Sequence, residues 1–199
     1  TTGYYSPWEW SLTYYGLQPS TTYNVTILPG MSDPHGNTID QEQTVTFTTA
    51  PYDPSATLEM SGVLALYRQG GSTALWTSHR NIDQMTVDLY NLRPAQFHQI
   101  VNGNSTGDRD FNPSSNVQIW SNTITPDNPL NERGYTRLEL LDDSGNELPP
   151  GFYYTSLNSP DVEYRSRHLN GRAIILANAN LTLKTTTTEA MIWVTDLST

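Results

Sequence analysis

The stretch Met85-Thr86-Val87-Asp88-Leu89 alternates apolar and polar side chains at every position. Successive side chains of a β-strand point to opposite faces of a sheet, so this stretch predicts a strand with one buried and one solvated face. β-branched and aromatic residues, which favour strands, occupy most positions where the same pattern recurs. It recurs at residues 23–27, 45–48, 117–120, 137–140 and 191–194. The sequence therefore predicts an all-β protein.

Turn-forming residues lie between the predicted strands. They include Pro29-Gly30, Asp33-Pro34-His35-Gly36-Asn37, Gly70-Gly71-Ser72, Asp142-Asp143-Ser144-Gly145-Asn146 and Pro149-Pro150-Gly151. Many short strands separated by regular turn signals are typical of an antiparallel β-sandwich. One segment departs from the strand period, because Phe97, Ile100 and Val101 follow Pro94 at helical spacing. We expect one short helix over residues 94–101.

A domain boundary is expected near residue 50. The sequence Ala50-Pro51-Tyr52-Asp53-Pro54 places two prolines directly after a predicted strand, and proline cannot continue a central ladder. Residues 1–52 hold too few strands for a complete sandwich of about seven strands, whereas residues 53–199 hold enough candidates for one. We therefore predict a partial module over residues 1–52 and one sandwich domain over residues 53–199.

Composition excludes several classes of function. The chain has 199 residues, with 20 acidic and 10 basic side chains, a net charge of −10 and no cysteine. The absence of cysteine excludes a disulfide framework, a thiolate nucleophile and a Cys-ligated metal. Binding to nucleic-acid phosphates would need a basic cluster, but Lys184 is the only lysine and the arginines are scattered. We expect no nucleic-acid partner.

The chain is weakly charged and rich in uncharged polar residues. Only 15% of its residues are charged, and serine, threonine and asparagine are abundant. This composition suits strands with a wet face, so we expect an extracytoplasmic location: periplasmic, cell-surface or secreted. No apolar run approaches the roughly 18 residues of a membrane-spanning helix. The abrupt ends suggest a segment of a longer parent chain, which would carry any membrane tether.

Residues that usually carry catalysis are dispersed. Histidines stand at positions 35, 79, 98 and 168, without zinc-protease spacing, and no serine-hydrolase elbow occurs. Acidic pairs such as Asp108/Asp110, Asp142/Asp143 and Asp161/Glu163 lie in turn-like contexts, where carboxylates usually bind their own backbone. We expect no enzymatic activity, no cofactor and no metal. The alternatives are a weak Ca²⁺ site after Asp142 and an enzyme site in which His79 or His168 meets carboxylates in space.

Aromatic residues crowd the first fifteen positions. Trp8 and Trp10 stand between Tyr4-Tyr5 and Tyr14-Tyr15. The two tryptophans share parity and would point the same way in a strand, which favours packing in a core or against a neighbouring domain. The alternative is an exposed face on a secreted Ig-like adhesion or carbohydrate-binding module. Together with Trp193, these tryptophans are the candidates for an interaction surface.

Residues 17–49 resemble the second half of a bacterial Ig-like domain. In that pattern a strand follows "L-x-P-x-T-x-Y", a "D-x-x-G-N" loop comes next, and "F-T-T" closes the module. The matching residues here are Leu17-Gln18-Pro19-Ser20-Thr21-Thr22-Tyr23, Asp33-Pro34-His35-Gly36-Asn37 and Phe47-Thr48-Thr49. The resemblance implies that residues 1–52 are the C-terminal part of such a domain.

The rest of the chain resembles an early module of bacterial alpha-2-macroglobulins. Residues 64–68, residues 87–92 and the segment around Phe97 are similar to its first strands and helix. Leu138-Glu139-Leu140-Leu141-Asp142 with Gly145, and Leu148-Pro149-Pro150-Gly151-Phe152-Tyr153, resemble the family's "D-x-x-G … L-P-x-G-x-Y" hairpin. We expect residues 142–146 to set the register of that hairpin. Residues 178–184 and 190–197 resemble its strand pair "N-x-x-L-x-x-K … A-x-x-W-V-T-D-L". In the family that pair ends one macroglobulin-like domain and runs toward the next.

The resemblance implies a role in protease trapping. In alpha-2-macroglobulins a protease cuts an exposed bait segment, and a conformational change then entraps it, often with covalent capture by a Cys–Gln thioester. Asp40-Gln41-Glu42-Gln43 has Asp40 where the thioester motif has cysteine, and residues 102–115 are an ordinary loop rather than a clear bait segment. The resemblance thus implies a non-catalytic scaffold. Its partners would be neighbouring domains of the parent chain and, through the parent, proteases.

Overall fold

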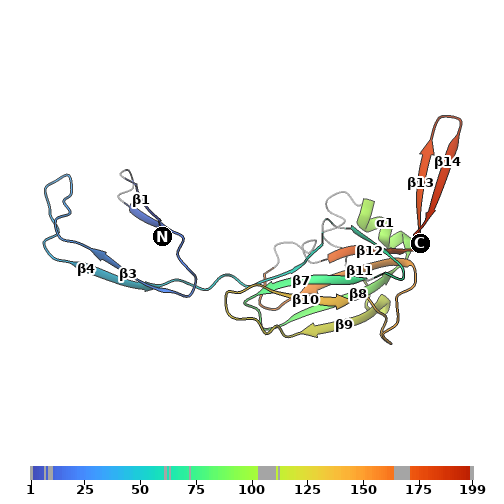
Figure 1. Cartoon of the computed structure of the whole chain (residues 1–199), viewed down its shortest axis with the longest axis horizontal. Coiled ribbons are helices and arrows are strands. Elements are labelled where there is room, and N and C mark those ends of the chain that lie inside the picture. The colour runs from blue at the N-terminus through green and yellow to red at the C-terminus, as the bar shows by residue number, and fades with distance from the viewer. Residues whose placement is uncertain are drawn as a thin grey trace. The chain divides into compact units, whose positions relative to one another are not determined.

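The structure is a computed structural model of the whole chain and describes residues 2–6, 8, 11–60, 62, 64–71, 73–102, 111, 113–163 and 171–197. Within these residues it contains fourteen strands, one α-helix and one short 3₁₀-helix (Figure 1). The predicted all-β fold class is therefore confirmed. The chain divides into two compact units, Thr1–Tyr52 and Asp53–Thr199.

The first unit consists of two antiparallel hairpins. Its strands are β1 (Thr2–Ser6), β2 (Ser11–Tyr15), β3 (Thr22–Ile27) and β4 (Gln43–Thr48), with β1 paired to β2 and β3 paired to β4. One face of the β3–β4 hairpin is apolar, and the Tyr23 and Phe47 rings stack on it with centroids 5.8 Å apart. On the opposite face, Thr22 and Thr48 join their hydroxyls at 2.9 Å. The alternation predicted for residues 23–27 thus separates an apolar face from a hydroxyl-bearing one.

A tyrosine at the start of a strand anchors the chain in each unit. The Gln18 backbone N–H donates a hydrogen bond to the Tyr23 hydroxyl at 2.6 Å. In the second unit, the Tyr153 hydroxyl donates to the Pro149 carbonyl oxygen at 2.7 Å. Such a bond from a strand tyrosine to the backbone a few residues upstream is the tyrosine corner of Greek-key sandwiches. It gives a physical reason for the Leu-x-Pro-x-x-x-Tyr and Leu-Pro-Pro-Gly-Phe-Tyr sequences.

The second unit begins with a two-sheet sandwich. Its elements are β5 (Ser55–Leu58), β6 (Leu64–Arg68), β7 (Ala74–Arg80), β8 (Met85–Leu92), α1 (Pro94–Asn102), η1 (Ser115–Val117), β9 (Gln118–Ile124), β10 (Gly134–Glu139), β11 (Gly151–Asn158) and β12 (Gly171–Ala177). One sheet has the order β10-β7-β5 and the other has the order β6-β12-β11-β8-β9. The described pairings are antiparallel except that β6 runs parallel to β12.

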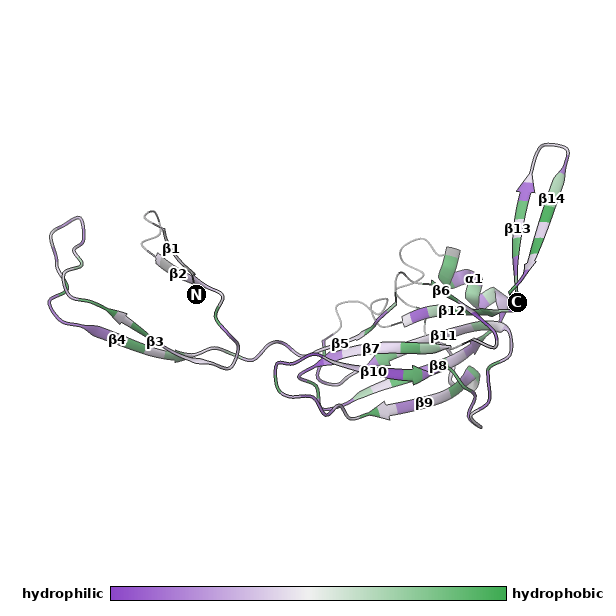
Figure 2. Ribbon diagram, viewed as in Figure 1, coloured by the Kyte–Doolittle hydropathy of each residue, from purple (hydrophilic) through white to green (hydrophobic). Residues whose placement is uncertain are grey.

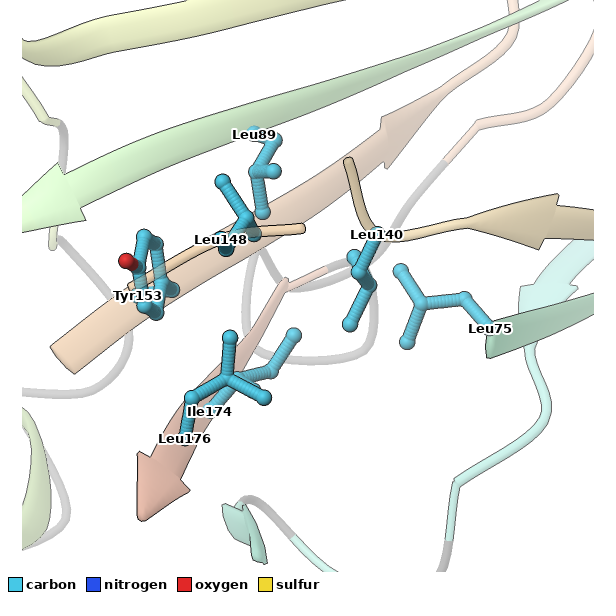
Figure 3. Packing of buried hydrophobic residues seen from close by; sticks show 7 residues of the cluster. All are labelled: Leu75, Leu89, Leu140, Leu148, Tyr153, Ile174 and Leu176. Carbon is cyan, nitrogen blue, oxygen red and sulfur yellow. The ribbon is translucent and has the colours of Figure 1, made fainter. Parts of the chain in front are cut away.

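The core lies between these two sheets. One cluster joins residues from both sheets and from the connection between β10 and β11 (Figure 3); its buried members are Leu75, Leu89, Leu140, Leu148, Tyr153, Ile174 and Leu176. A second cluster joins β5, β8 and β11; its buried members are Ala56, Leu58, Ile82, Met85, Val87 and Leu157. Met85, Val87 and Leu89 all point into this space, as their alternation with Thr86 and Asp88 predicts.

Helix α1 covers the other face of the five-stranded sheet. The ring of Phe97 lies 4.4 Å, centroid to centroid, from that of Phe152 in β11. Ile100, buried on the helix, joins Leu92 and Tyr154 in a third apolar cluster. The helix predicted over residues 94–101 is confirmed. Phe97 and Ile100 pack on an apolar face of the sheet, whereas Val101 is 41% exposed.

The prediction that residues 138–142 and 148–153 form a hairpin is wrong. Strand β10 belongs to the three-stranded sheet and β11 to the five-stranded sheet. The turn after Asp142 closes only one bridge, between Leu141 and Glu147. The two prolines at 149–150 cannot donate ladder hydrogen bonds, so the chain crosses from one sheet to the other there. Leu140 and Leu148 flank the turn and are both buried between the sheets.

The last two strands stand outside the sandwich. Strands β13 (Ala179–Thr185) and β14 (Ala190–Asp196) pair only with each other among the described strands. They follow β12 directly and form a ribbon (Figure 1). We call β13–β14 the C-terminal ribbon. The sandwich over the described residues is therefore built by β5 to β12 alone.

Candidate interaction surface

The C-terminal ribbon exposes both of its faces. Every side chain on its two strands is exposed, and hydrophobic positions run along both strands in Figure 2. In the register of the ribbon, Leu181 lies opposite Val194 and Leu183 lies opposite Ile192. These four side chains share one face and are 56% to 61% exposed. We call this the aliphatic face of the ribbon.

Trp193 lies on the other face of the ribbon. It pairs with Thr182 in the register, its side chain is 65% exposed, and Lys184 and Met191 are on the same face. Trp193 lies on the opposite face from its sequence neighbours Ile192 and Val194, as alternation along a strand requires. Its assignment to an interaction surface stays a prediction.

The other two candidate tryptophans belong to the first unit. Trp8 lies in the turn between β1 and β2 and its side chain is 91% exposed, so it is not a core residue of this unit. Trp8 is in a turn, where side chains do not alternate between two faces as they do in a strand. Trp10 lies outside the described residues. A role of either tryptophan in binding stays a prediction.

Two Asp-x-x-Gly-Asn turns share one hydrogen-bond pattern. The Asp142 carboxylate accepts bonds from the backbone N–H groups of Ser144 and Asn146, at 2.9 and 2.7 Å. In the first unit, Asp33 accepts bonds from the backbone N–H groups of His35 and Asn37, at 2.9 and 2.8 Å. Both carboxylates bind their own turns, as we expected for acids in turn contexts.

These bonds make the turn after Asp142 sensitive to pH. Hydrogen bonds from Asn146 lower the pKa of the Asp142 carboxyl below its ordinary value. A depressed folded-state pKa contributes stability that is full at neutral pH and is lost as the pH falls through that pKa, below about pH 4. Asp142→Asn should therefore be less stable than the natural chain at pH 7 and approach it in acid. Thermal unfolding measured from neutral to strongly acidic pH checks this.

The neighbouring carboxyl provides the control for that experiment. Asp143→Asn removes one acidic charge from the same turn but leaves the Asp142 hydrogen bonds intact. Its melting temperature should follow that of the natural chain across the whole pH range. Equal pH dependence in Asp142→Asn and the natural chain would contradict the assignment.

The described histidines do not meet in a site. His79 in β7 is buried, and its Nε2 lies 3.1 Å from the Thr136 hydroxyl oxygen. Burial lowers the pKa of His79. His35 is in a turn of the first unit and His98 is on the exposed side of α1, while His168 lies outside the described residues. Among the described residues, no three His, Asp or Glu side chains are grouped to hold a metal.

The sequence pattern did not identify a pair of exposed aromatic residues on the sandwich. Trp76 in β7 is 47% exposed and Tyr135 in β10 is 59% exposed. Both lie on the outer face of the three-stranded sheet, away from the core. The sequence could have identified Tyr135 as exposed, because residues 135–139 alternate. Tyr135 shares its face with the charged residues Arg137 and Glu139. Trp76 stands directly after Leu75 and gives no such signal.

The fold and these surfaces define a class of protein. A two-sheet sandwich with a helix on one sheet is preceded by two hairpins and followed by a ribbon whose faces are open. The described helix is too short to cross a membrane. The chain is an all-β protein of the multidomain, sandwich-containing class. The features that stand out among its described residues are exposed apolar surfaces.

Comparison with solved structures narrows that class. A structure of native alpha-2-macroglobulin from Escherichia coli spanning domains MG0-NIE-MG1 matches 99% of this chain, with a TM-score of 0.56 and 15% identity. The Salmonella alpha-2-macroglobulin mutant Y1175G matches 98%, with a TM-score of 0.70 and 16% identity. No protein-family model and no curated protein matches the sequence. The resemblance drawn from the motifs is confirmed at the level of the fold.

The chain covers only part of these structures. It spans 63% of the Escherichia coli chain and 11% of the Salmonella chain. A second Escherichia coli structure, spanning NIE-MG1, matches 73% of this chain at 13% identity and a TM-score of 0.50. The chain therefore has the fold of a part of bacterial alpha-2-macroglobulin.

Proposed function

We propose that the chain is a non-catalytic structural segment of a bacterial alpha-2-macroglobulin-like endopeptidase inhibitor that works outside the cytoplasm. The observation that carries the proposal is the C-terminal ribbon. A two-stranded ribbon is marginal by itself in water and needs further strands or another packed layer. Its aliphatic face, with Leu183 and Ile192 more than half exposed, is the inner face of a domain whose other strands would follow.

The comparisons with solved structures support a boundary between the first unit, residues 1–52, and the sandwich. The matched share of the chain falls from 99% to 73% when the solved structure lacks MG0. That difference is about a quarter of the chain, which is the share of the unit Thr1–Tyr52. We therefore assign residues 1–52 to the end of an Ig-like MG0 module and the sandwich to NIE. The ribbon is then the first hairpin of the next macroglobulin-like domain. This differs from the motif resemblance, in which the strand pair ends the domain over residues 53–199.

The first unit fits this assignment. Its two hairpins are too few for a sandwich, and Tyr14 of β2 lies beside the apolar residues Val25, Ile27 and Met31 at an open groove. Earlier strands of the same module would fill that groove. The first unit and the ribbon each leave apolar surface uncovered, and the role that we propose for the segment is to hold neighbouring domains of the trap in place. Proteases would be partners only of the whole inhibitor.

This role predicts different effects of one substitution in two settings. Leu183→Asp places a charge on the aliphatic face of the ribbon. In the 199-residue chain it should leave the melting temperature nearly unchanged, because the side chain is already 56% exposed. In the longer parent inhibitor it should destabilise the next domain by about 3 kcal/mol, because a buried unpaired charge is costly. Protease inhibition by the parent should fall with it. Calorimetry and a protease assay measure the two effects.

The opposite face of the ribbon supplies the matched control. Thr182→Asp introduces the same charge beside Trp193, outside the aliphatic face. It should have a much smaller effect on parent stability. The 199-residue chain alone should not inhibit a protease at micromolar concentration. Inhibition by the isolated chain, or equal effects of the two substitutions in the parent, would contradict the proposal.

A further inference from the structure

The three-stranded sheet carries an ordered set of side chains on its outer face. In the register of β7 and β10, Trp76 lies opposite Arg137 and Ser78 lies opposite Tyr135. On the other side of β7, Thr57 of β5 lies opposite Ser78. The Glu59 N–H donates to the Trp76 carbonyl oxygen at 2.8 Å, which places Glu59 beside Trp76. Arg80 follows Ser78 by two residues on the same face. We call these residues, with Arg80 and Glu139, the outer aromatic face.

The two rings are close enough to act together. Trp76 and Tyr135 are diagonal neighbours on adjacent strands, and such neighbours are roughly 7–8 Å apart and within reach of aromatic side chains. Both rings are about half exposed, at 47% and 59%. Their strands are fixed on the inner side by Leu75 and Leu138, which pack in the core. The rings therefore stand on a rigid sheet rather than on a loop, and little ordering is needed for them to bind a ligand.

The charges of this face balance, unlike those of the whole chain. Arg137 forms an ion pair with Glu139 on the same strand. Glu59 and Arg80 contribute one charge of each sign to the same side of the sheet. The local sum is zero on a chain whose net charge is −10. A charged ligand would gain nothing from this balance, so the face suits an uncharged one.

The chemistry of the face matches a pyranose sugar. Exposed aromatic rings stack against apolar C–H surfaces, which are one side of a sugar ring. Carboxylate and guanidinium groups at the border of the rings can accept from and donate to sugar hydroxyls. The Thr57 hydroxyl adds another donor and acceptor beside them. The ribbon differs, because its aliphatic face has no such polar groups and suits burial in a core.

We propose that the outer aromatic face binds an uncharged oligosaccharide, with Trp76 and Tyr135 as the stacking residues and Arg137, Glu139 and Glu59 as hydrogen-bonding residues. This binding does not depend on the scaffold role, since it uses the three-stranded sheet β10-β7-β5, which does not pair with the ribbon. A segment that also holds glycan would keep the inhibitor close to a polysaccharide-bearing surface.

The test is a titration of the full 199-residue chain with maltohexaose, cellohexaose and chitohexaose. The indole N–H resonance of Trp76, assigned by comparison with Trp76→Phe, reports binding by NMR. The Trp76 variants lack this resonance, so their affinity is measured from the backbone amide resonances of β7 and β10. At least one of the three sugars should shift it saturably below ~10 mM. Trp76→Ala should weaken the affinity at least about tenfold, and Tyr135→Ala should weaken it as well. Trp76→Phe keeps a ring and should retain most of the binding.

Trp193→Ala and Trp8→Ala are the matched controls, because each removes an exposed tryptophan elsewhere in the chain. Both should bind the sugar as the natural chain does. Three outcomes would overturn the proposal. The first is no shift of Trp76 with any of the sugars, and the second is unchanged affinity in Trp76→Ala. The third is self-association in analytical ultracentrifugation that Trp76→Ala abolishes, because the face would then be a protein interface.

Discussion

Replacing Leu140 with alanine is expected to lower the free energy of unfolding of the Asp53–Thr199 unit by about 3 to 4 kcal/mol. Leu140 follows β10 and is completely buried between the two sheets, near Leu75 (Figure 3). Its backbone N–H donates to the Thr73 carbonyl oxygen at 2.8 Å, which holds it in place. The alanine would therefore leave a cavity that the flanking sheets cannot close. Denaturant unfolding monitored by circular dichroism measures the loss.

The same substitution in the ribbon is the matched control. Leu183→Ala removes an identical group from a side chain that is 56% exposed. Its effect on the stability of the 199-residue chain should stay within about 0.5 kcal/mol. Equal losses in the two variants would contradict the burial pattern and would mean that the ribbon packs against the sandwich in solution.

These two leucines show what the sequence can and cannot predict. Both stand in alternating sequences, residues 137–140 and 181–184, and both of these form or adjoin strands. Alternation shows which side chains share a face, but it does not show whether another layer covers that face. Only the sheet order shows that Leu140 faces a second sheet and that Leu183 faces solvent. The extent of the sandwich was therefore not predictable from the strand pattern.

The connection after β10 has a similar explanation. The Asp142 turn has every local sign of a hairpin, and the structure contains that turn. The strands on its two sides nevertheless lie in different sheets, because Pro149 and Pro150 end the ladder and Tyr153 pairs onward with β8 and β12. Local turn chemistry predicts the turn, whereas strand pairing depends on contacts far apart in sequence. The same limit applies to Trp76, whose exposure depends on which sheet face β7 turns outward.

Substituting Gly171 by alanine is expected to cost about 2 to 3 kcal/mol of stability. Gly171 begins β12, and a methyl group there would overlap the hydroxyl group and ring of Tyr154 on β11. The Tyr154 ring is buried and cannot swing aside, because Phe111 and Tyr90 lie against it with centroids 5.0 and 6.3 Å away. The structure must therefore either distort the β11–β12 ladder or displace this aromatic group.

A double-mutant cycle with Tyr154→Leu isolates that overlap. Tyr154→Leu destabilises the unit by itself, but it removes the atoms that the new methyl group would meet, so Gly171→Ala should then cost less than about 1 kcal/mol. Gly151→Ala is the matched control, since its nearest contact would be the Tyr153 ring at 3.5 Å, an ordinary van der Waals distance. We expect a change within about 0.5 kcal/mol there. Two results would contradict this prediction: additive effects in the cycle, or similar losses of stability for both glycines. Either would mean that the Tyr154 ring leaves room for a methyl group at Gly171.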